Sequence, residues 1–165
     1  MSGAPSMLSD DTQPFSVLSS TPAAAAQALW FAVQRKPWSS LAVLPAGHGG
    51  SALAAGNALY DVGLLASGGP MRLLDARAVT LATSASFIVN MTSLLTASER
   101  RSSAAQRLVV VLASVLEQPA SIPIALAADA VVLTVALGTT TLDDARQTIG
   151  LVGAEHILGC ITLSP

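Results

Sequence analysis

The clearest candidate for a chemical site in the sequence is one glycine-rich segment, which reads Gly47-His48-Gly49-Gly50-Ser51. A phosphate-binding loop points backbone N–H groups at the phosphates, while a lysine neutralises their charge and a hydroxyl binds magnesium. The segment has the glycines and Ser51 for that chemistry, but Gly50 stands where such loops carry the lysine. This pattern favours a tight turn without a nucleotide, with anion binding through the loop amides as the alternative.

The other polar residues carry weaker signals. Asp75 follows an apolar run and is expected either to organise a metal ion or a water molecule, or to cap a loop. His48 is expected to contact a phosphate or to face solvent, and His156 is expected at the surface. Ser51 has no base beside it, which argues against a nucleophilic role. We therefore predict no catalytic residue and no metal site.

The composition bounds the class of protein. The chain has 165 residues, a net charge of −2, 52% hydrophobic residues and 11% charged residues, against about 25% charged in an average soluble domain. So apolar a chain can bury enough surface to fold, which excludes disorder, and its few basic residues give no electrostatic basis for nucleic-acid binding. The single cysteine, Cys160, excludes an internal disulfide, and a cytoplasmic location is expected.

The apolar runs are too interrupted for a membrane-spanning helix, which needs about 18 or more consecutive apolar residues. The longest run, residues 122–137, contains Pro123 and Asp129. Residues 1–20 have neither the basic start nor the apolar core of a signal peptide. They are rich in Ser, Asp, Thr and Pro, so we predict a flexible N-terminal arm over 1–20 and one domain over residues 21–165.

Strands and helices are predicted to alternate through this domain. Thr21 as N-cap and Pro22 at the first helical position predict a helix start. Uncharged Val- and Leu-rich runs are typical of strands buried on both faces of a parallel sheet. We expect helices over residues 23–33, 51–65, 78–97, around 119–128 and from the 139–144 stretch to about 152, and strands over 41–44, 71–74, 108–112, 130–136 and 157–163.

This alternation predicts an α/β fold, a three-layer α/β/α domain with a mainly parallel sheet of about five or more strands. Open parallel sheets bind ligands outside the carboxyl ends of their strands. The glycine loop follows the first predicted strand, so any site is expected there.

The order of these motifs resembles the cytoplasmic bacterial tyrosine kinase domains of capsule and exopolysaccharide synthesis, which belong to the MinD/ParA-like P-loop ATPases. The resemblance covers about residues 23–163. It implies a P-loop-NTPase-like fold. The family motif ILVTSAGPGEGKSTVAANLA is similar to residues 41–59, VLLIDAD to 72–77, DLVIIDTPP to 107–115, ADGVLLVVRAGRT to 128–140 and LGVVLN to 157–163.

The chain departs from this family in the residues that carry the chemistry. The P-loop lysine falls on Gly50, and the second hydroxyl of its lysine-serine-threonine triplet falls on Ala52. The second aspartate of the DAD-like strand end falls on Arg77, and the magnesium-organising aspartate falls on Leu112. The resemblance thus implies a pseudo-enzyme without ATP or magnesium as cofactor. Its degenerate nucleotide loop comprises Gly47, His48, Gly49, Gly50, Ser51 and Asp75, of which Ser51 and Asp75 keep the family's residue types.

Two further features of the family are replaced. Its ring-forming helix motif, EAYRTLRTN, is similar to residues 24–32, where the glutamate and two arginines fall on Ala24, Gln27 and Trp30. The family's C-terminal tyrosine cluster is missing, because the one tyrosine, Tyr60, lies inside a predicted core helix.

Three aromatic residues, Trp30, Phe31 and Trp38, carry the prediction of a partner. They lie on or beside the first predicted helix, whose polar face is nearly all alanine. One interpretation is that they cover the sheet edge. The other is a partner-binding surface, since aromatic anchors with few charges are typical of interface cores.

The leading hypothesis is therefore a non-catalytic scaffold or regulator of bacterial exopolysaccharide synthesis or export. It would act in the cytoplasm, peripherally at the inner membrane, as a homo-oligomer or with a membrane-anchored polysaccharide co-polymerase or synthase. The alternatives are an ATPase or tyrosine kinase with an unorthodox nucleotide loop, another MinD/ParA-like positioning protein, and a sensor that binds an anion or nucleotide through loop amides.

Overall fold

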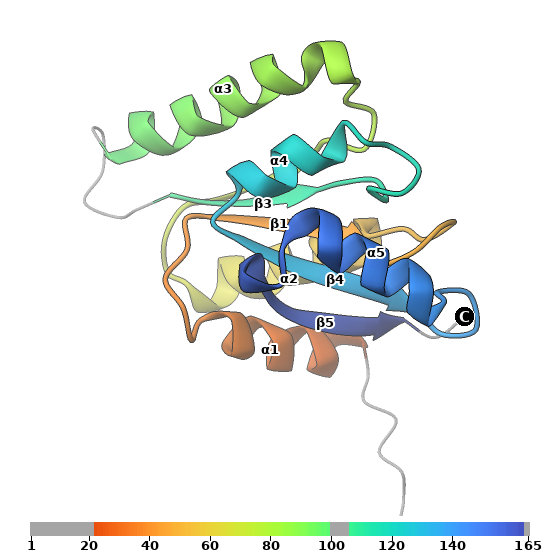
Figure 1. The fold of residues 1–165 in the computed structure, drawn as a ribbon. Helices are drawn as coiled ribbons and strands as arrows, with labels where there is room; N and C mark the ends of the chain where they lie inside the picture. The colour runs from red at the N-terminus through yellow and green to blue at the C-terminus, as the bar shows by residue number, and fades with distance from the viewer. Residues whose placement is uncertain (1–21, 100–105, 164–165) are drawn as a thin grey trace, which may run out of the picture.

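A computed structural model of the chain describes residues 22–99 and 106–163 (Figure 1). The predicted arm over residues 1–20 and the predicted helix cap Thr21 lie outside the described residues. The elements are, in chain order, α1 (Pro22–Val33), β1 (Ser40–Pro45), α2 (Leu53–Ala66), β2 (Met71–Asp75), α3 (Leu81–Glu99), β3 (Arg107–Val111), α4 (Ser121–Ala127), β4 (Ala130–Ala136), α5 (Leu142–Val152), a short 3-10 turn (Ala154–His156) and β5 (Ile157–Leu163).

The strands form one parallel five-stranded sheet in the order β2-β3-β1-β4-β5. β1 is central, and its Leu41 pairs with Val109 of β3 on one side and Ala130 of β4 on the other. Every residue of β1 is buried, as expected of a strand covered on both faces. The predicted parallel α/β sheet is confirmed.

Helices cover both faces of this sheet, with α1 and α2 on one side and α3, α4 and α5 on the other (Figure 1). Successive strand residues point to opposite faces. Leu41 and Val43 accordingly pack with α1 and α2, whereas Ala42 and Leu44 pack with the helices of the opposite layer. The molecule is thus a three-layer α/β/α domain of P-loop-NTPase-like architecture.

α2 packs unusually close to the sheet, and this fixes the position of its first turn. A Cβ on Gly56 would overlap Val111 of β3, and one on Gly63 would overlap Met71 of β2 and reach within 2.8 Å of Trp30. Glycine at these two helical positions lets the helix backbone approach the strands. The glycine loop that precedes α2 is therefore held at the carboxyl edge of the sheet.

The predicted elements are all present, and the described bounds differ by at most three residues from those expected. The largest difference is the start of α3, expected at residue 78 and found at Leu81. Its cause is local, because the hydroxyl of Thr83 accepts from the N–H of Thr80 and so caps the helix there. None of the described helices is both long enough and apolar enough to span a membrane.

Candidate functional site

The glycine loop joins the carboxyl end of β1 to α2 and is anchored by two other elements. The N–H of Ala46 donates to the carbonyl of Thr134 in β4 at 2.8 Å. The Ala46 carbonyl accepts from the hydroxyl of Thr148 in α5 at 3.1 Å, and Thr148 is completely buried. The entrance to the loop is therefore fixed in place by the scaffold.

The second half of the loop folds back on β1. A Cβ on Gly50 would lie 2.9 Å from Cβ of Pro45, closer than real Cβ contacts come. Gly49 has a φ of 66°, a left-handed conformation that favours glycine. The position that carries the lysine in the resembling family thus has no room for a side chain without movement of Pro45.

A carboxylate from another loop meets the glycine loop. The N–H of Gly49 donates to Oε1 of Glu117 at 2.6 Å, although the two residues are 68 positions apart. Glu117 lies in the turn between β3 and α4, which also ends at the carboxyl edge of the sheet. A loop amide that would meet a phosphate oxygen in a P-loop is here bonded to the protein's own anion.

His48 lies between two carboxylates. Its Nδ1 is 3.9 Å from Oε1 of Glu117, and its Nε2 is 3.8 Å from Oδ1 of Asp144 in the first turn of α5. His48 is about half exposed, whereas the side chain of Asp144 is 19% exposed. The sequence led us to expect that His48 contacts a phosphate or faces solvent, and it did not predict these two carboxylates beside the ring. The rim of the loop is therefore lined with negative charge.

Asp75 ends β2 and is held by Arg77, the residue that stands at the family's second aspartate. The carboxylate accepts from Nε of Arg77 at 2.9 Å, from Nη2 at 2.7 Å and from the Arg77 backbone N–H at 3.1 Å. The side-chain hydrogen bonds from Arg77 lower the pKa of Asp75, and the same pairing raises the pKa of Arg77. Both residues are partly exposed. The Asp75 carboxylate therefore caps the turn after β2, and its charge is paired with the guanidinium of Arg77.

Two positions that carry chemistry in the resembling family belong to the core of this protein. Leu112 is fully buried, and its N–H donates to the carbonyl of Val43 at 2.9 Å. Ala52 is also fully buried, packed in the layer of α1 and α2. Ser51 is exposed, and its hydroxyl accepts from the N–H of Leu53, the first residue of α2, at 3.3 Å. The positions of the resembling family's magnesium-organising aspartate and second hydroxyl are thus core positions in this protein.

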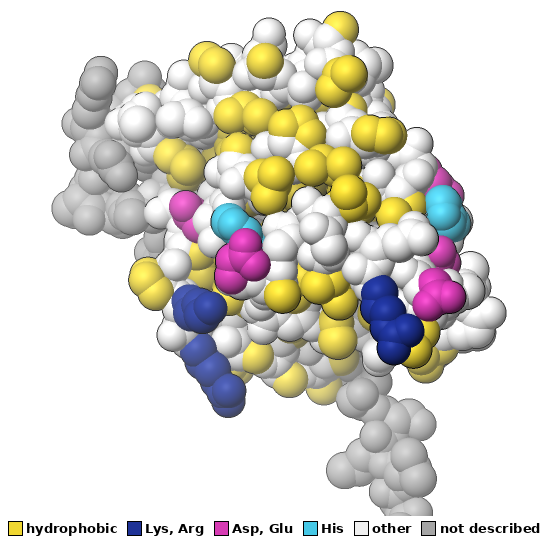
Figure 2. All heavy atoms as spheres, viewed as in Figure 1, with side chains coloured by type: hydrophobic (Ala, Val, Ile, Leu, Met, Phe, Trp, Pro, Cys, Tyr) yellow, Lys and Arg dark blue, Asp and Glu magenta, His cyan; other side chains and the backbone are white. Residues whose placement is uncertain are grey.

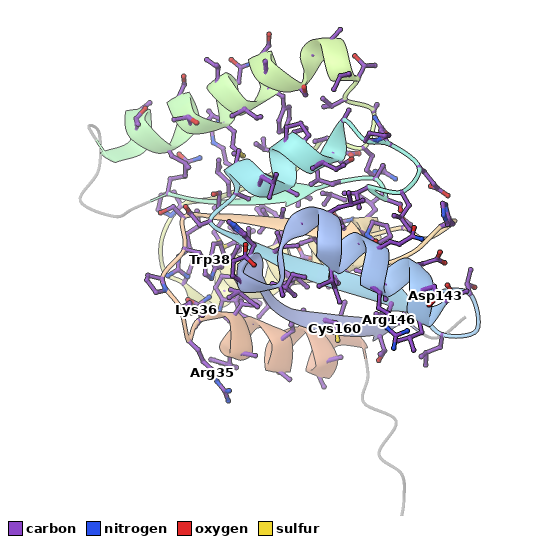
Figure 3. All side chains as sticks on the ribbon, viewed as in Figure 1. Arg35, Lys36, Trp38, Asp143, Arg146 and Cys160 are labelled. Carbon is purple, nitrogen blue, oxygen red and sulfur yellow. The ribbon has the colours of Figure 1, made fainter. Side chains whose placement is uncertain are left out.

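Among the side chains of the described residues, no group of three or more His, Cys, Asp or Glu residues is arranged to hold a metal ion. A separate hollow of about 180 Å³ lies where the end of α1 meets the start of β5, at the opposite end of the sheet from the glycine loop. It is lined by Ala32, Arg35, Lys36, Ile157 and Leu158. Figure 3 shows Arg35 pointing away from the body of the protein at that end.

The structure corrects the prediction of a partner surface at Trp30 and Trp38, because both are interior residues, 2% and 6% exposed. Their rings meet edge to face with centroids 5.7 Å apart, and the guanidinium of Arg107 lies 4.9 Å from the Trp38 ring centroid. Nε1 of Trp38 donates to the carbonyl of Val33 at 3.1 Å. The alternative interpretation, in which these aromatics cover the sheet, describes both tryptophans.

Phe31 differs from the tryptophans in being 66% exposed. It shares the outer face of α1 with Ala24, Gln27 and Ala28, all of which are exposed. This outer face of α1 is free of charged side chains up to Arg35. Of the three aromatic residues predicted to contact a partner, Phe31 is therefore the one that lies on the surface.

The wider surface has few charges, as the composition requires. Figure 2 shows hydrophobic side chains gathered over the region of α4 and α5, with charged groups at its margins. Figure 3 shows Asp143 and Arg146 together near the start of α5, where Nη1 of Arg146 lies 3.6 Å from Oδ1 of Asp143.

Glu117 and Asp144 were missed as site residues by the sequence analysis. Asp144 was visible only as a negative charge in the first turn of a predicted helix, which is its usual place. Glu117 follows β3 at the edge where parallel sheets hold their sites. That position was the available signal, but the spacing to Gly49 reveals nothing until the strand order is known.

Comparison of the sequence with models of known protein families and with curated proteins finds no match.

Proposed function

We propose that this chain is a non-catalytic, P-loop-like protein that acts through protein–protein contacts, as a scaffold or regulator in bacterial exopolysaccharide synthesis or export. Two contacts of the glycine loop support the absence of catalysis. Its Gly49 amide is bonded to Glu117, and its lysine position, Gly50, is packed against Pro45.

The charges around the loop support the same conclusion. Binding a nucleoside triphosphate requires cations that offset the several negative charges of its phosphates in a site of low dielectric. Here the side chains at the loop rim include Glu117 and Asp144, and the cation of Arg77 is paired with Asp75. A polyphosphate in this loop would meet like charge without a lysine, so we expect the loop not to bind ATP.

The exopolysaccharide setting rests on the resemblance in motif order to the bacterial tyrosine kinase domains. The partner in that setting is a membrane-anchored polysaccharide co-polymerase or synthase, or a second copy of the chain, with the protein held at the inner membrane by its partner. Phe31 on the charge-free outer face of α1 is the residue we assign to the contact. A pull-down with the cytoplasmic part of a co-polymerase tests this half, and Phe31→Asp is expected to abolish capture.

An ATPase with an unorthodox loop is the competing function, and it would depend on Ser51 and Asp75. The experiment that separates the two is isothermal titration with ATP and ADP in magnesium, followed by a phosphate-release assay. We expect no binding at micromolar nucleotide and no turnover above a protein-free control. Turnover that falls in Ser51→Ala or Asp75→Ala would overturn the proposal.

A further inference from the structure

We propose that Glu117 is an internal ligand of the glycine loop. Its carboxylate takes the place that a phosphate oxygen holds in a nucleotide-bound P-loop, and it keeps the loop closed without a nucleotide. The inference rests on the proposed function, because it assumes a loop that is empty of nucleotide. It goes beyond that function by naming what holds the loop, and by implying that the surface around it is permanently set rather than switched by ATP.

The geometry gives the first argument. A hydrogen bond from a backbone N–H to a carboxylate is stronger than one between neutral groups and is correspondingly short. The Gly49–Glu117 bond is 2.6 Å long, whereas the two anchoring bonds of Ala46 are 2.8 and 3.1 Å. Gly49 is also the loop residue with a positive φ, so its amide direction is set by a conformation that glycine favours.

The position of Glu117 in the chain gives the second argument. The turn after β3 follows the strand next to β1, and in P-loop-like sheets ligands bind where the ends of adjacent strands meet. A carboxylate from this turn therefore reaches the loop from the side of the ligand. It connects the loops after β1 and β3, which a nucleotide would otherwise bridge.

The charged groups that face the contact are few. His48 lies 3.9 Å from the Glu117 carboxylate, and Asp144 faces His48 from α5. Neither replaces Glu117 as acceptor for the Gly49 amide, because that amide donates to Glu117. The carboxylate of Glu117 is thus a positioning group for the loop, with His48 and Asp144 as its charged neighbours.

The test reads the Gly49 amide directly, by nuclear magnetic resonance on the full chain. In Glu117→Gln, which keeps an acceptor oxygen but removes the charge, the Gly49 amide proton should move away from its wild-type chemical shift at the same pH. Glu117→Ala should raise amide hydrogen exchange at Gly49 about tenfold or more.

Two controls separate this effect from a general loss of structure. Glu155→Gln removes a carboxylate that lies 3.9 Å from His156, the same spacing as Glu117 to His48, and should leave the chemical shift of the Gly49 amide proton unchanged. The amide of Gly68, in the turn between α2 and β2, should keep its exchange rate in both Glu117 variants. In Asp144→Asn the Gly49 amide proton should stay near its wild-type chemical shift.

The outcomes for the two proposals are distinguishable. A Gly49 amide proton that keeps its wild-type chemical shift in Glu117→Gln, or an unchanged exchange rate in Glu117→Ala, would overturn the internal-ligand proposal whatever the nucleotide results are. Micromolar ATP binding by the wild type would overturn the proposed function, and displacement of the Gly49–Glu117 signal by ATP would show that the loop is switched rather than permanently closed.

Discussion

A Cβ at Gly50 would stand 2.9 Å from Cβ of Pro45, so the loop folds across the end of its own strand at the position where the resembling family carries a lysine. Because of this close approach, we expect that a lysine introduced at Gly50 does not by itself create an ATP-binding site. The lysine would have to displace the proline ring before it could reach a phosphate.

The first prediction follows for Gly50→Lys. We expect no gain of ATP binding by isothermal titration, together with a loss of about 1–3 kcal/mol in the free energy of unfolding, because overpacking forces the loop to move. Urea unfolding measures the second effect. Micromolar ATP binding with unchanged stability would contradict this account of the loop.

A second prediction concerns the glycines of two helices. Gly56→Ala should destabilise the protein by about 1–3 kcal/mol, since the new methyl group would overlap Val111 and push α2 from the sheet. Gly150→Ala in α5 is the matched control, because a Cβ there meets nothing within 4 Å. It should stabilise by about 0.5–1 kcal/mol through helix propensity. Equal effects of the two substitutions in urea unfolding would rule out the close approach of α2.

The pair of Asp75 and Arg77 predicts a pH effect with a defined sign. The side-chain hydrogen bonds from Arg77 lower the pKa of Asp75 in the folded protein below its unfolded value. The stabilisation is therefore complete above the unfolded pKa of an aspartate, about 3.9, and is lost as the pH falls through the lower folded value. Since both groups are partly exposed, we expect the effect to be small and to weaken with salt.

Carboxyl-carbon nuclear magnetic resonance measures this titration directly. Arg77→Ala should raise the pKa of Asp75 towards its ordinary value, whereas Arg72→Ala, which changes another arginine of the same segment, should leave it low. A low Asp75 pKa that survives the loss of Arg77 would contradict the assignment of the pair.

A fourth prediction separates the aromatic residues of α1. Trp30→Ala should cost about 3–5 kcal/mol of unfolding free energy, because it leaves a cavity in the packed layer of α1 and α2. Phe31→Ala should change the unfolding free energy by less than about 0.5 kcal/mol, as expected of an exposed side chain. Similar losses for both variants in urea unfolding would disagree with the observed burial.

Much of the fold could be predicted because the signals are local. The uncharged runs that form β1, β3 and β4 indicated buried parallel strands. The start of α5 was indicated by the polar stretch 139–144, in which the hydroxyl of Thr141 accepts from the N–H of Asp144. The site was harder, because it depends on strand order. Gly49 and Glu117 meet only because β3 lies beside β1, and nothing in their separation of 68 residues indicates contact.

The burial of the two tryptophans could not be predicted from the sequence for a different reason. Aromatic residues on a helix with few charges fit a covered sheet and an interface equally well, since both are apolar and tightly packed. Their burial is decided by the contacts of Trp30 with Trp38 and Arg107, which come from three separate parts of the chain.

Isothermal titration of the wild-type chain with ATP and magnesium decides whether the glycine loop binds nucleotide. The loop geometry predicts no binding by the wild type at micromolar nucleotide, because the Gly49 amide is bonded to Glu117 and the loop carries no lysine. Saturable micromolar binding by the wild type, lost in Ser51→Ala, would contradict the claim that this P-loop-like protein works without nucleotide.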